Sequence, residues 1–435
     1  MAAIRHMAPS LLEMNGSDIE AVSTRMDQLM YYNQSAKSAV EMALHDALGK
    51  ALGKPVYELL GGKKRSRVPV LWLLGTGSID GDIAEALAKK AAGFVAYKVK
   101  VGVGDPKDDA LRTRKVCEAL GKGLLISSDA NQGYSLEQAL TYVKAVDGSG
   151  LDFFEQPISG HNIEGMTKLA AATSIPIGFD EGLHSIEDLL MHHERKAARG
   201  CSLKTIKLGG LKGVMHAAEL CEKLGMQVNL ACKVAESGIA AASLMHIAAA
   251  VPQVAWGVSI SNQYLADDIV RATVKVVDGH AEVPGGVGLG VVGLHGEPVL
   301  GRLGLAERFV RRALVDRHRL ALEVGAFHEP GGGHAHGQRD HESGKRKGQG
   351  VPEHLPGEGI TEHFDEMRKR IGGDRISRPG VPQGQHQHEQ RQHDDGGVVG
   401  QEECEAGHET WGRAAGRVGG AAGRTGGGIS PGPWI

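Results

Sequence analysis

The segment from residue 94 to residue 130 decides the fold. It reads FVAYKVK at 94–100, DDALRTRKVCEAL at 108–120 and LLISSDA at 124–130. The first and third pieces are short apolar runs typical of buried strands, and the middle piece has apolar residues at helical spacing. A strand, an amphipathic helix and a second strand in this order predict one repeat of a parallel sheet covered by helices.

The same alternation continues on both sides of this segment. Six further apolar runs are VPVLWLL (68–74), LDFFEQP (151–157), IPIGFD (175–180), SLKTIK (202–207), QVNLAC (227–232) and VAWGVS (254–259). Helical patterns such as LEQALTYVKAV and GVMHAAELCEKLG separate them. Eight strands alternating with helices predict an α/β fold with a closed (β/α)8-type TIM barrel. An open doubly wound sheet is the alternative, but no GxGxxG follows the first strand.

Composition excludes several classes of protein. The chain has 435 residues, with 49 basic and 52 acidic side chains and a net charge of -3, so it has no general attraction for nucleic acid or anionic membranes. No apolar run reaches the roughly 18 residues of a membrane span, and the N-terminal MAAIRHMAPS lacks the apolar core of a signal peptide. Five cysteines without a CxxC pair are typical of a reducing compartment. We therefore expect a cytoplasmic protein with neither nucleic-acid nor membrane partners.

Ionisable residues follow the predicted strands at the ends that form a barrel's mouth, where active sites lie. They are Lys98 and Lys100 on the second strand, Asp129, Glu155 and Asp180 on the next three, and Lys207 on the sixth. Neighbouring carboxylates repel each other unless a cation lies among them, and hard oxygen ligands select Mg²⁺, with Mn²⁺ as an alternative. One such Asp is often only a helix cap, but the consecutive series favours a functional interpretation.

The lysines flank the predicted carboxylate cluster. A lysine beside another cation loses proton affinity and can act as a base near neutral pH, and Lys98 is the neighbour that would have this effect on Lys100. Lys207 is expected on the opposite flank. This arrangement suits removal of a proton next to a carboxylate, with the metal stabilising the resulting enediolate. The glycine cluster LGGLKG (208–213) is interpreted as a turn and not as a phosphate-binding loop.

The order of these motifs resembles that of the enolase superfamily, in particular its muconate lactonizing enzyme subgroup. The stretch AKSAVEMALHDALGKALGKPVYELLGG (36–62) resembles the helical signature of the mandelate racemase/muconate lactonizing enzyme family. The similar barrel motifs are YKVKVG, SSDANQGY, FFEQP, GFDEGLHS and IKLGGLKGVMHA. The mandelate racemase branch would have a histidine at the end of the seventh strand, whereas this chain reads LACKVAES.

The resemblance implies a role for each matching residue. Lys100 and Lys207 would be the opposing acid/base pair, beside Lys98, and Asp129, Glu155 and Asp180 the Mg²⁺ ligands. Asn131 and Glu181 would support the ligands, and Glu236 would line the substrate pocket. The implied substrate is a small carboxylate, and the implied assembly is a homo-oligomer.

The resemblance also implies a domain organisation. Residues 1–65 would be the helical remnant of a truncated N-terminal α+β capping domain. Residues 66–292 would form the barrel, in the family's modified (β/α)7β version, and VVDGHAEVPGGVGLGV (276–291) would return to the cap. Residues 293–435, rich in glycine, histidine and arginine and without apolar periodicity, are predicted to be disordered or to come from a shifted reading frame.

Two opposed bases allow several outcomes from one enediolate. The first expectation is cycloisomerisation of the muconate cycloisomerase type. Racemisation or epimerisation of an N-acyl amino acid or dipeptide is the alternative, as is dehydration of a hydroxyproline-type substrate. A further alternative, outside the enzymes, is an inactive truncated fragment that binds metal but cannot shield the intermediate from water.

Overall fold

The computed structural model describes residues 1–272 and 274–293. All of the described residues belong to the first of two units of the chain, Met1–His334. The predicted tail, 293–435, lies outside the described residues apart from its first residue. No helix among the described residues is long and apolar enough to cross a membrane.

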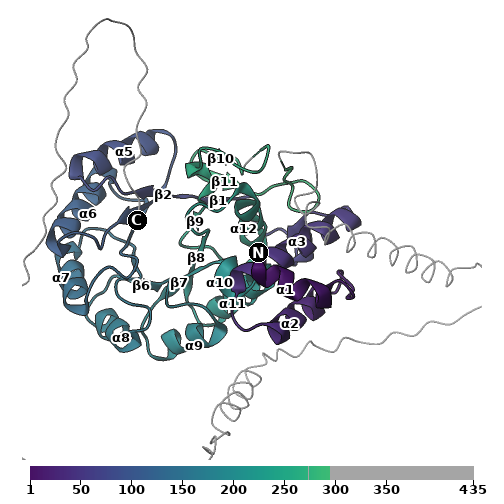
Figure 1. Ribbon diagram of the computed structural model, residues 1–435. Coiled ribbons are helices and arrows are strands. Elements are labelled where there is room, and N and C mark those ends of the chain that lie inside the picture. Colours follow the sequence, from purple (N-terminus) through teal and green to yellow (C-terminus); the bar gives the residue numbers. More distant parts are fainter. Residues whose placement is uncertain (273, 294–435) are drawn as a thin grey trace, which may run out of the picture. The chain divides into compact units, whose positions relative to one another are not determined.

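Eight parallel strands form a ring in chain order (Figure 1). They are β2 (Leu71–Leu74), β3 (Ala96–Lys100), β4 (Leu125–Asp129), β5 (Phe153–Glu155), β6 (Ile177–Phe179), β7 (Gly200–Leu203), β8 (Gln227–Ala231) and β9 (Val258–Ser259). Each strand pairs with the next, and a parallel bridge between Val70 and Val258 closes the ring. The predicted TIM barrel is therefore confirmed.

Helices connect consecutive strands and surround the ring (Figure 1). They are α5 (Ile79–Ala91), α6 (Pro106–Leu120), α7 (Leu136–Val146), α8 (Ile163–Ala171), α9 (Ile186–Glu194), α10 (Thr205–Leu208), α11 (Leu211–Lys223) and α12 (Gly238–Ala250). Side chains of Asp105, Ser135, Asn162 and Ser185 cap four of them, which fixes where each helix begins. The only helix that follows β9 within the described residues is the short 3₁₀ helix Asn262–Tyr264, in keeping with a (β/α)7β barrel.

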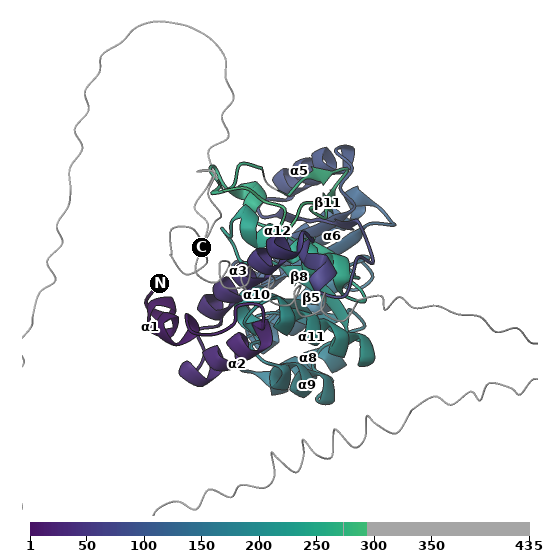
Figure 2. The same cartoon turned by 90° about the vertical axis from the view of Figure 1, so that its right-hand side faces the viewer.

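Four helices precede the barrel. They are α1 (Ala2–Leu11), α2 (Ile19–Leu29), α3 (Gln34–Leu52) and α4 (Val56–Leu59). The first three share a small apolar core that includes Met7, Val22, Met26 and Leu44. Helix α3 packs against α10 and α11 on one side of the barrel (Figure 2). The N-terminal helices therefore contact the part of the barrel that follows β7.

The start of the first predicted strand and part of the predicted return segment form a second, smaller sheet. The run 68–74 is not one strand: β1 (Arg67–Pro69) pairs antiparallel with β11 (His280–Glu282), and only β2 joins the barrel. Strand β10 (Val276–Val277) completes this sheet. Beyond it, the Leu289 N–H donates to Asp46 Oδ1 at 2.9 Å, so the chain does return to α3.

Aromatic side chains fill the end of the barrel where the strands begin. Phe153 and Trp256 stack with ring centroids 4.0 Å apart, next to the first residues of β2 and β3. Gly200, on β7, leaves room for the indole, because a Cβ there would lie 2.4 Å from a ring carbon of Trp256. The opposite end, where the strands finish, is left for polar side chains.

Gly200→Ala should destabilise the barrel by about 1–3 kcal/mol, because the new methyl group overpacks the Trp256 site. Gly285→Ala is the matched control, since a Cβ at Gly285 meets nothing within 4 Å. We expect the control to change the free energy of unfolding by less than about 0.5 kcal/mol. Urea denaturation of both variants measures the difference, and equal stabilities would contradict this account of the interior.

Candidate active site

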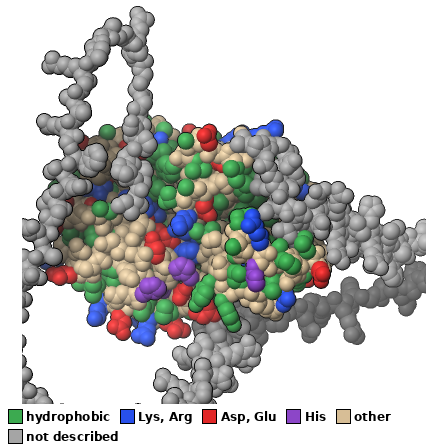
Figure 3. Space-filling model, in the orientation of Figure 1, with side chains coloured by type: hydrophobic (Ala, Val, Ile, Leu, Met, Phe, Trp, Pro, Cys, Tyr) green, Lys and Arg blue, Asp and Glu red, His purple; other side chains and the backbone are tan. Residues whose placement is uncertain are grey.

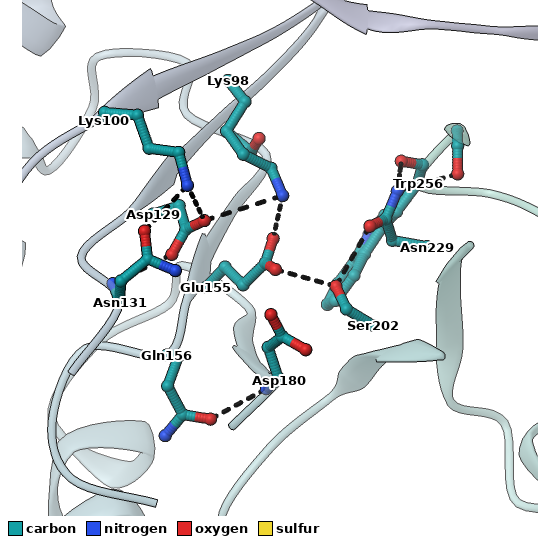
Figure 4. A network of polar contacts seen from close by, with 12 residues as sticks. Lys98, Lys100, Asp129, Asn131, Glu155, Gln156, Asp180, Ser202, Asn229 and Trp256 are labelled. Carbon is teal, nitrogen blue, oxygen red and sulfur yellow. Dashed lines mark hydrogen bonds and ion pairs between the residues drawn. The ribbon is translucent and has the colours of Figure 1, made fainter. Parts of the chain in front are cut away.

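Strand register brings the predicted carboxylates to one end of the barrel. Lys100 lies opposite Asp129, and Asp129 lies opposite Glu155, while Asp180 directly follows β6. Each of these three carboxylates is only 2% exposed. Figure 4 shows them converging from neighbouring strands. In the wider view of Figure 3, acidic, basic and histidine side chains lie close together near the middle of the face drawn.

The two lysines of β3 point to the same side of the strand and hold two of these carboxylates (Figure 4). Lys98 Nζ lies 2.5 Å from Glu155 Oε2 and 3.8 Å from Asp129 Oδ2. Lys100 Nζ lies 2.7 Å from Asp129 Oδ2 and donates to Asn131 Oδ1 at 2.7 Å. The Lys98 side chain is buried, whereas that of Lys100 is 29% exposed. Lys100 is therefore the member of the pair that can meet a substrate.

The structure corrects the position of Lys207. The run 202–207 is not one strand, because β7 ends at Leu203 and α10 begins at Thr205. Lys207 lies within that helix. Its Nζ contacts the Asp180 carboxylate and donates to the carbonyls of Asp180, at 2.5 Å, and Ser202, at 3.0 Å. All three N–H bonds of the Lys207 ammonium thus have acceptors in the protein.

The first residue after β7 is Lys204, which the sequence analysis did not single out. Its Nζ lies 2.5 Å from Asp180 Oδ2, and its side chain is 17% exposed. Lys204 lies inside the run SLKTIK, which was interpreted as one strand, so no local pattern marked it as the residue after a strand end. Lys204 and Lys100 therefore flank the carboxylates from β7 and β3.

The charges of this cluster depend on one another. Burial would raise the pKa of Asp129, but Lys100 and Lys98 hold it below its usual value. Lys207 and Lys204 do the same for the pKa of Asp180. Glu155 behaves differently, because burial, with the charges of Asp129 and Asp180, raises its pKa despite Lys98.

The lysines after β7 also differ from each other. Burial would lower the pKa of Lys204, but the charges of Asp180, Glu155 and Glu181 outweigh it and raise that pKa. Burial lowers the pKa of Lys207 in spite of Asp180. Lys204 therefore interacts with several carboxylates, Asp180 first among them, whereas Lys207 interacts mainly with Asp180.

Polar side chains hold the carboxylates in place. Ser202 Oγ lies 2.8 Å from Glu155 Oε1 and 3.0 Å from Asn229 Oδ1, and Asn229 in turn donates to the Trp256 carbonyl at 3.1 Å (Figure 4). The Asp180 N–H donates to Gln156 Oε1 at 2.8 Å. These three neutral residues, which the sequence analysis missed, fix the carboxylates without adding charge.

The predicted supporting residues fall into two places. Asn131 joins the cluster, because its Nδ2 donates to Glu181 Oε1 at 3.0 Å while its Oδ1 accepts from Lys100. Glu181 Oε2 is buried without a hydrogen-bond partner. Glu236 lies in the loop after β8, where it accepts the Lys233 N–H at 2.7 Å. Burial raises the pKa of Glu236, opposed by that N–H and by the charge of Lys204.

The donor set fits Mg²⁺ by its chemistry. Asp129, Glu155 and Asp180 are hard oxygen donors on neighbouring strand ends, and Mg²⁺ prefers carboxylates in such sites. Within residues 1–272 and 274–293, no three Asp, Glu, His or Cys side chains converge closely enough to hold a metal as they stand. Lysine ammonium groups instead neutralise each carboxylate in this structure.

Comparisons with known proteins agree with this architecture. Residues 82–293 match the enolase C-terminal domain-like family, and residues 1–61 match the mandelate racemase/muconate lactonizing enzyme N-terminal domain. Muconate cycloisomerase 1 of Pseudomonas putida is 32% identical over 66% of this chain and 76% of its own length. N-succinyl-L-Arg/Lys racemase of Bacillus cereus is 30% identical over 56% of this chain and 65% of its own length.

Solved structures place the chain in the same group. Muconate lactonizing enzyme from Pseudomonas putida superposes with a TM-score of 0.65 at 32% identity, over 69% of this chain and 84% of that one. The Pseudomonas fluorescens enzyme complexed with muconolactone gives 0.62 at 33% identity, over 64% of this chain and 76% of that one. This chain belongs to the mandelate racemase/muconate lactonizing enzyme family of isomerases, in the muconate lactonizing enzyme subgroup of the enolase superfamily.

Proposed function

We propose that the protein is a Mg²⁺-dependent acid/base enzyme that moves a proton at the carbon next to a substrate carboxylate. The observation that carries this proposal is the series of charged strand ends, in which Lys100 and Lys204 flank three buried carboxylates. A lysine on each flank can serve opposite faces of a substrate bound between them.

Asp129, Glu155 and Asp180 would hold the Mg²⁺. Bound there, the ion would supply positive charge to the substrate carboxylate and so make the neighbouring C–H bond more acidic. Lys98 holds the Glu155 carboxylate in place and opposes the rise of its pKa, and Asn131 keeps the Lys100 ammonium directed toward the cluster. The protein's own contribution is thus positioning, charge balance and proton transfer at two Nζ atoms.

We propose that Lys204, and not Lys207, is the acid/base partner of Lys100. The Lys207 ammonium is already bonded to three acceptors within the protein, so it has no N–H left for a substrate. Lys207 would instead be a positioning residue that holds the Asp180 carboxylate. Lys204 has one ion pair and reaches the surface of the mouth.

Cycloisomerisation of a muconate-type dicarboxylate is the reaction that the relatives favour. In its lactonising direction, a carboxylate oxygen adds to the carbon–carbon double bond, and one lysine ammonium gives its proton to the carbon next to the other carboxylate. The reverse reaction returns that proton to the lysine. The 32% identity to a muconate cycloisomerase supports this assignment.

Racemisation of an N-acyl amino acid is the second candidate. One lysine would remove the α-proton, and the lysine on the other flank would return a proton to the opposite face. The 30% identity to an N-succinyl amino acid racemase and the opposed pair of lysines support it. In both candidates the substrate is a small carboxylate.

Lys204→Ala and Lys100→Ala should each reduce Mg²⁺-dependent exchange with deuterium at least 100-fold for the α-proton that the replaced lysine removes, because each change removes one base. NMR in D₂O measures the exchange, with muconolactone and with both enantiomers of an N-succinyl amino acid. Lys233→Ala, which alters an exposed lysine on the same rim, is the control and should leave exchange unchanged. Full exchange in Lys204→Ala would contradict its assignment, and no exchange in the wild type would favour the inactive fragment.

Asp129→Asn, Glu155→Gln and Asp180→Asn should each weaken Mg²⁺ binding at least ~10-fold, because each removes one charged oxygen ligand. Titration calorimetry with Mg²⁺, or electron paramagnetic resonance with Mn²⁺, measures the affinity without requiring a substrate. Asp152→Asn, a carboxylate at the start of β5 and away from the mouth, serves as control. Activity that survives an excess of chelator would refute the metal site.

A further inference from the structure

A carboxylate of the N-terminal helices contacts the barrel close to the proposed base Lys204. Glu41, on α3, is 2% exposed. Its Oε1 accepts the Lys212 N–H at 3.0 Å, and its Oε2 accepts the Leu211 N–H. Leu211 and Lys212 are the first two residues of α11. Glu41 therefore occupies the position of a helix cap, although it comes from another part of the chain.

Helix α11 has no cap of its own. The residue before it is Gly210, which has no side chain to accept the first N–H groups. Gly210 also has φ +147°, and a Cβ there would overlap the Glu41 carboxylate. The sequence at this point thus suits a side chain arriving from α3, and it excludes any residue larger than glycine.

The capped turn is the one that carries the two lysines. Lys204, α10 with Lys207, and Gly209 occupy the few residues between β7 and α11. Helix α10 packs directly against α3, and the Gln34 side chain of α3 lies beside Gly209. The far end of this turn is therefore fixed by α3, while its near end is fixed by β7.

The opposite flank of the site is held in a different way. The Lys100 carbonyl accepts from Arg112 Nη2 at 2.6 Å, and Arg112 pairs with Asp109 at 2.8 Å and with Asp82 at 2.5 Å. Asp109 also accepts the Gly102 N–H at 3.0 Å. All of these residues belong to the barrel. Lys100 is thus anchored by the barrel alone.

We propose that Glu41 is a positioning residue for one of the two bases: by capping α11 from the N-terminal helices, it fixes the turn that carries Lys204 and leaves Lys100 unaffected. The inference rests on the proposed role of Lys204. It adds that the packing of α3 against the barrel positions only the lysine that serves one face of the substrate, Lys204.

The burial of Glu41 makes it possible to distinguish a role in positioning the Lys204 turn from a role in stabilising the whole fold. Burial raises the pKa of Glu41 to about 7, against the effects of the two N–H groups and of Lys212. An ionised carboxylate at this position has a desolvation cost that a neutral amide would not have. Glu41→Gln relieves that cost but loses one of the two acceptor oxygens, so the turn should loosen while the fold survives.

The first test does not depend on activity. Hydrogen exchange by mass spectrometry should show at least tenfold faster exchange of the Leu211 and Lys212 amides in Glu41→Gln, and faster still in Glu41→Ala. Competitive acetylation with acetic anhydride should label Lys204 at least threefold faster in Glu41→Gln, with Lys100 unchanged as an internal control. Glu20→Gln is the matched variant, because it removes only the exposed Glu20–Lys212 ion pair at the same helix end.

The second test uses deuterium exchange of N-succinyl-L- and N-succinyl-D-arginine in the presence of Mg²⁺. One α-proton exchange is the one that Lys204→Ala abolishes, and we expect Glu41→Gln to slow it by about 10- to 100-fold, as a small displacement of a base can do. The other exchange, which Lys100→Ala abolishes, should be unchanged in Glu41→Gln. Glu20→Gln should spare both.

The outcomes separate this inference from the proposed function. Equal loss at both faces, or unchanged acetylation of Lys204 in both Glu41 variants, would overturn the positioning role. If neither enantiomer exchanges in the wild type, the proposed racemase activity fails, and the amide-exchange and acetylation results still decide whether Glu41 fixes the turn.

Discussion

Three carboxylates buried side by side at the barrel mouth are the constraint on which the rest of the site depends. Ionised groups at 2% exposure have lost their hydration and cannot remain charged without nearby positive charge. Lys98, Lys100, Lys204 and Lys207 provide that charge in this structure. Each lysine must therefore be held on a rigid element, because a misplaced ammonium would leave a carboxylate uncompensated.

The barrel meets this constraint by separating its two ends. Phe153 and Trp256 fill the end where the strands begin, with glycine on β7 making room for the indole. Asn229 links the two ends, since its amide contacts both Ser202, below Glu155, and the Trp256 carbonyl. Apolar packing thus occupies one end of the barrel interior, and the other end is free to be arranged for chemistry.

Much of this arrangement was predictable from the sequence, because apolar runs and the residue that ends each run are local features. Asp129 and Glu155 end their strands as expected, and the register that brings them together follows from parallel pairing. Lys204 was missed for a local reason as well. The run SLKTIK has only two apolar residues, Leu203 and Ile206, and this pattern does not show that the strand ends at Leu203 and that a four-residue helix follows. Contacts between distant segments, such as Glu41 with Leu211, have no signature in a single sequence.

The two proposed bases are held by different parts of the chain, and this asymmetry bears on how the reaction is controlled. Lys100 is tied to a buried network of Arg112 and Asp109 on α6 and Asp82 on α5, two consecutive helices of the barrel. Lys204 lies in a turn whose far end is capped from α3. A reaction that removes a proton from one face of the substrate and returns a proton to the other needs both lysines. Its rate is therefore limited by whichever lysine is less well positioned. The position of the N-terminal helices would therefore govern turnover through the Lys204 face, even though none of their side chains contacts the carboxylates in the part of the chain that the structure describes.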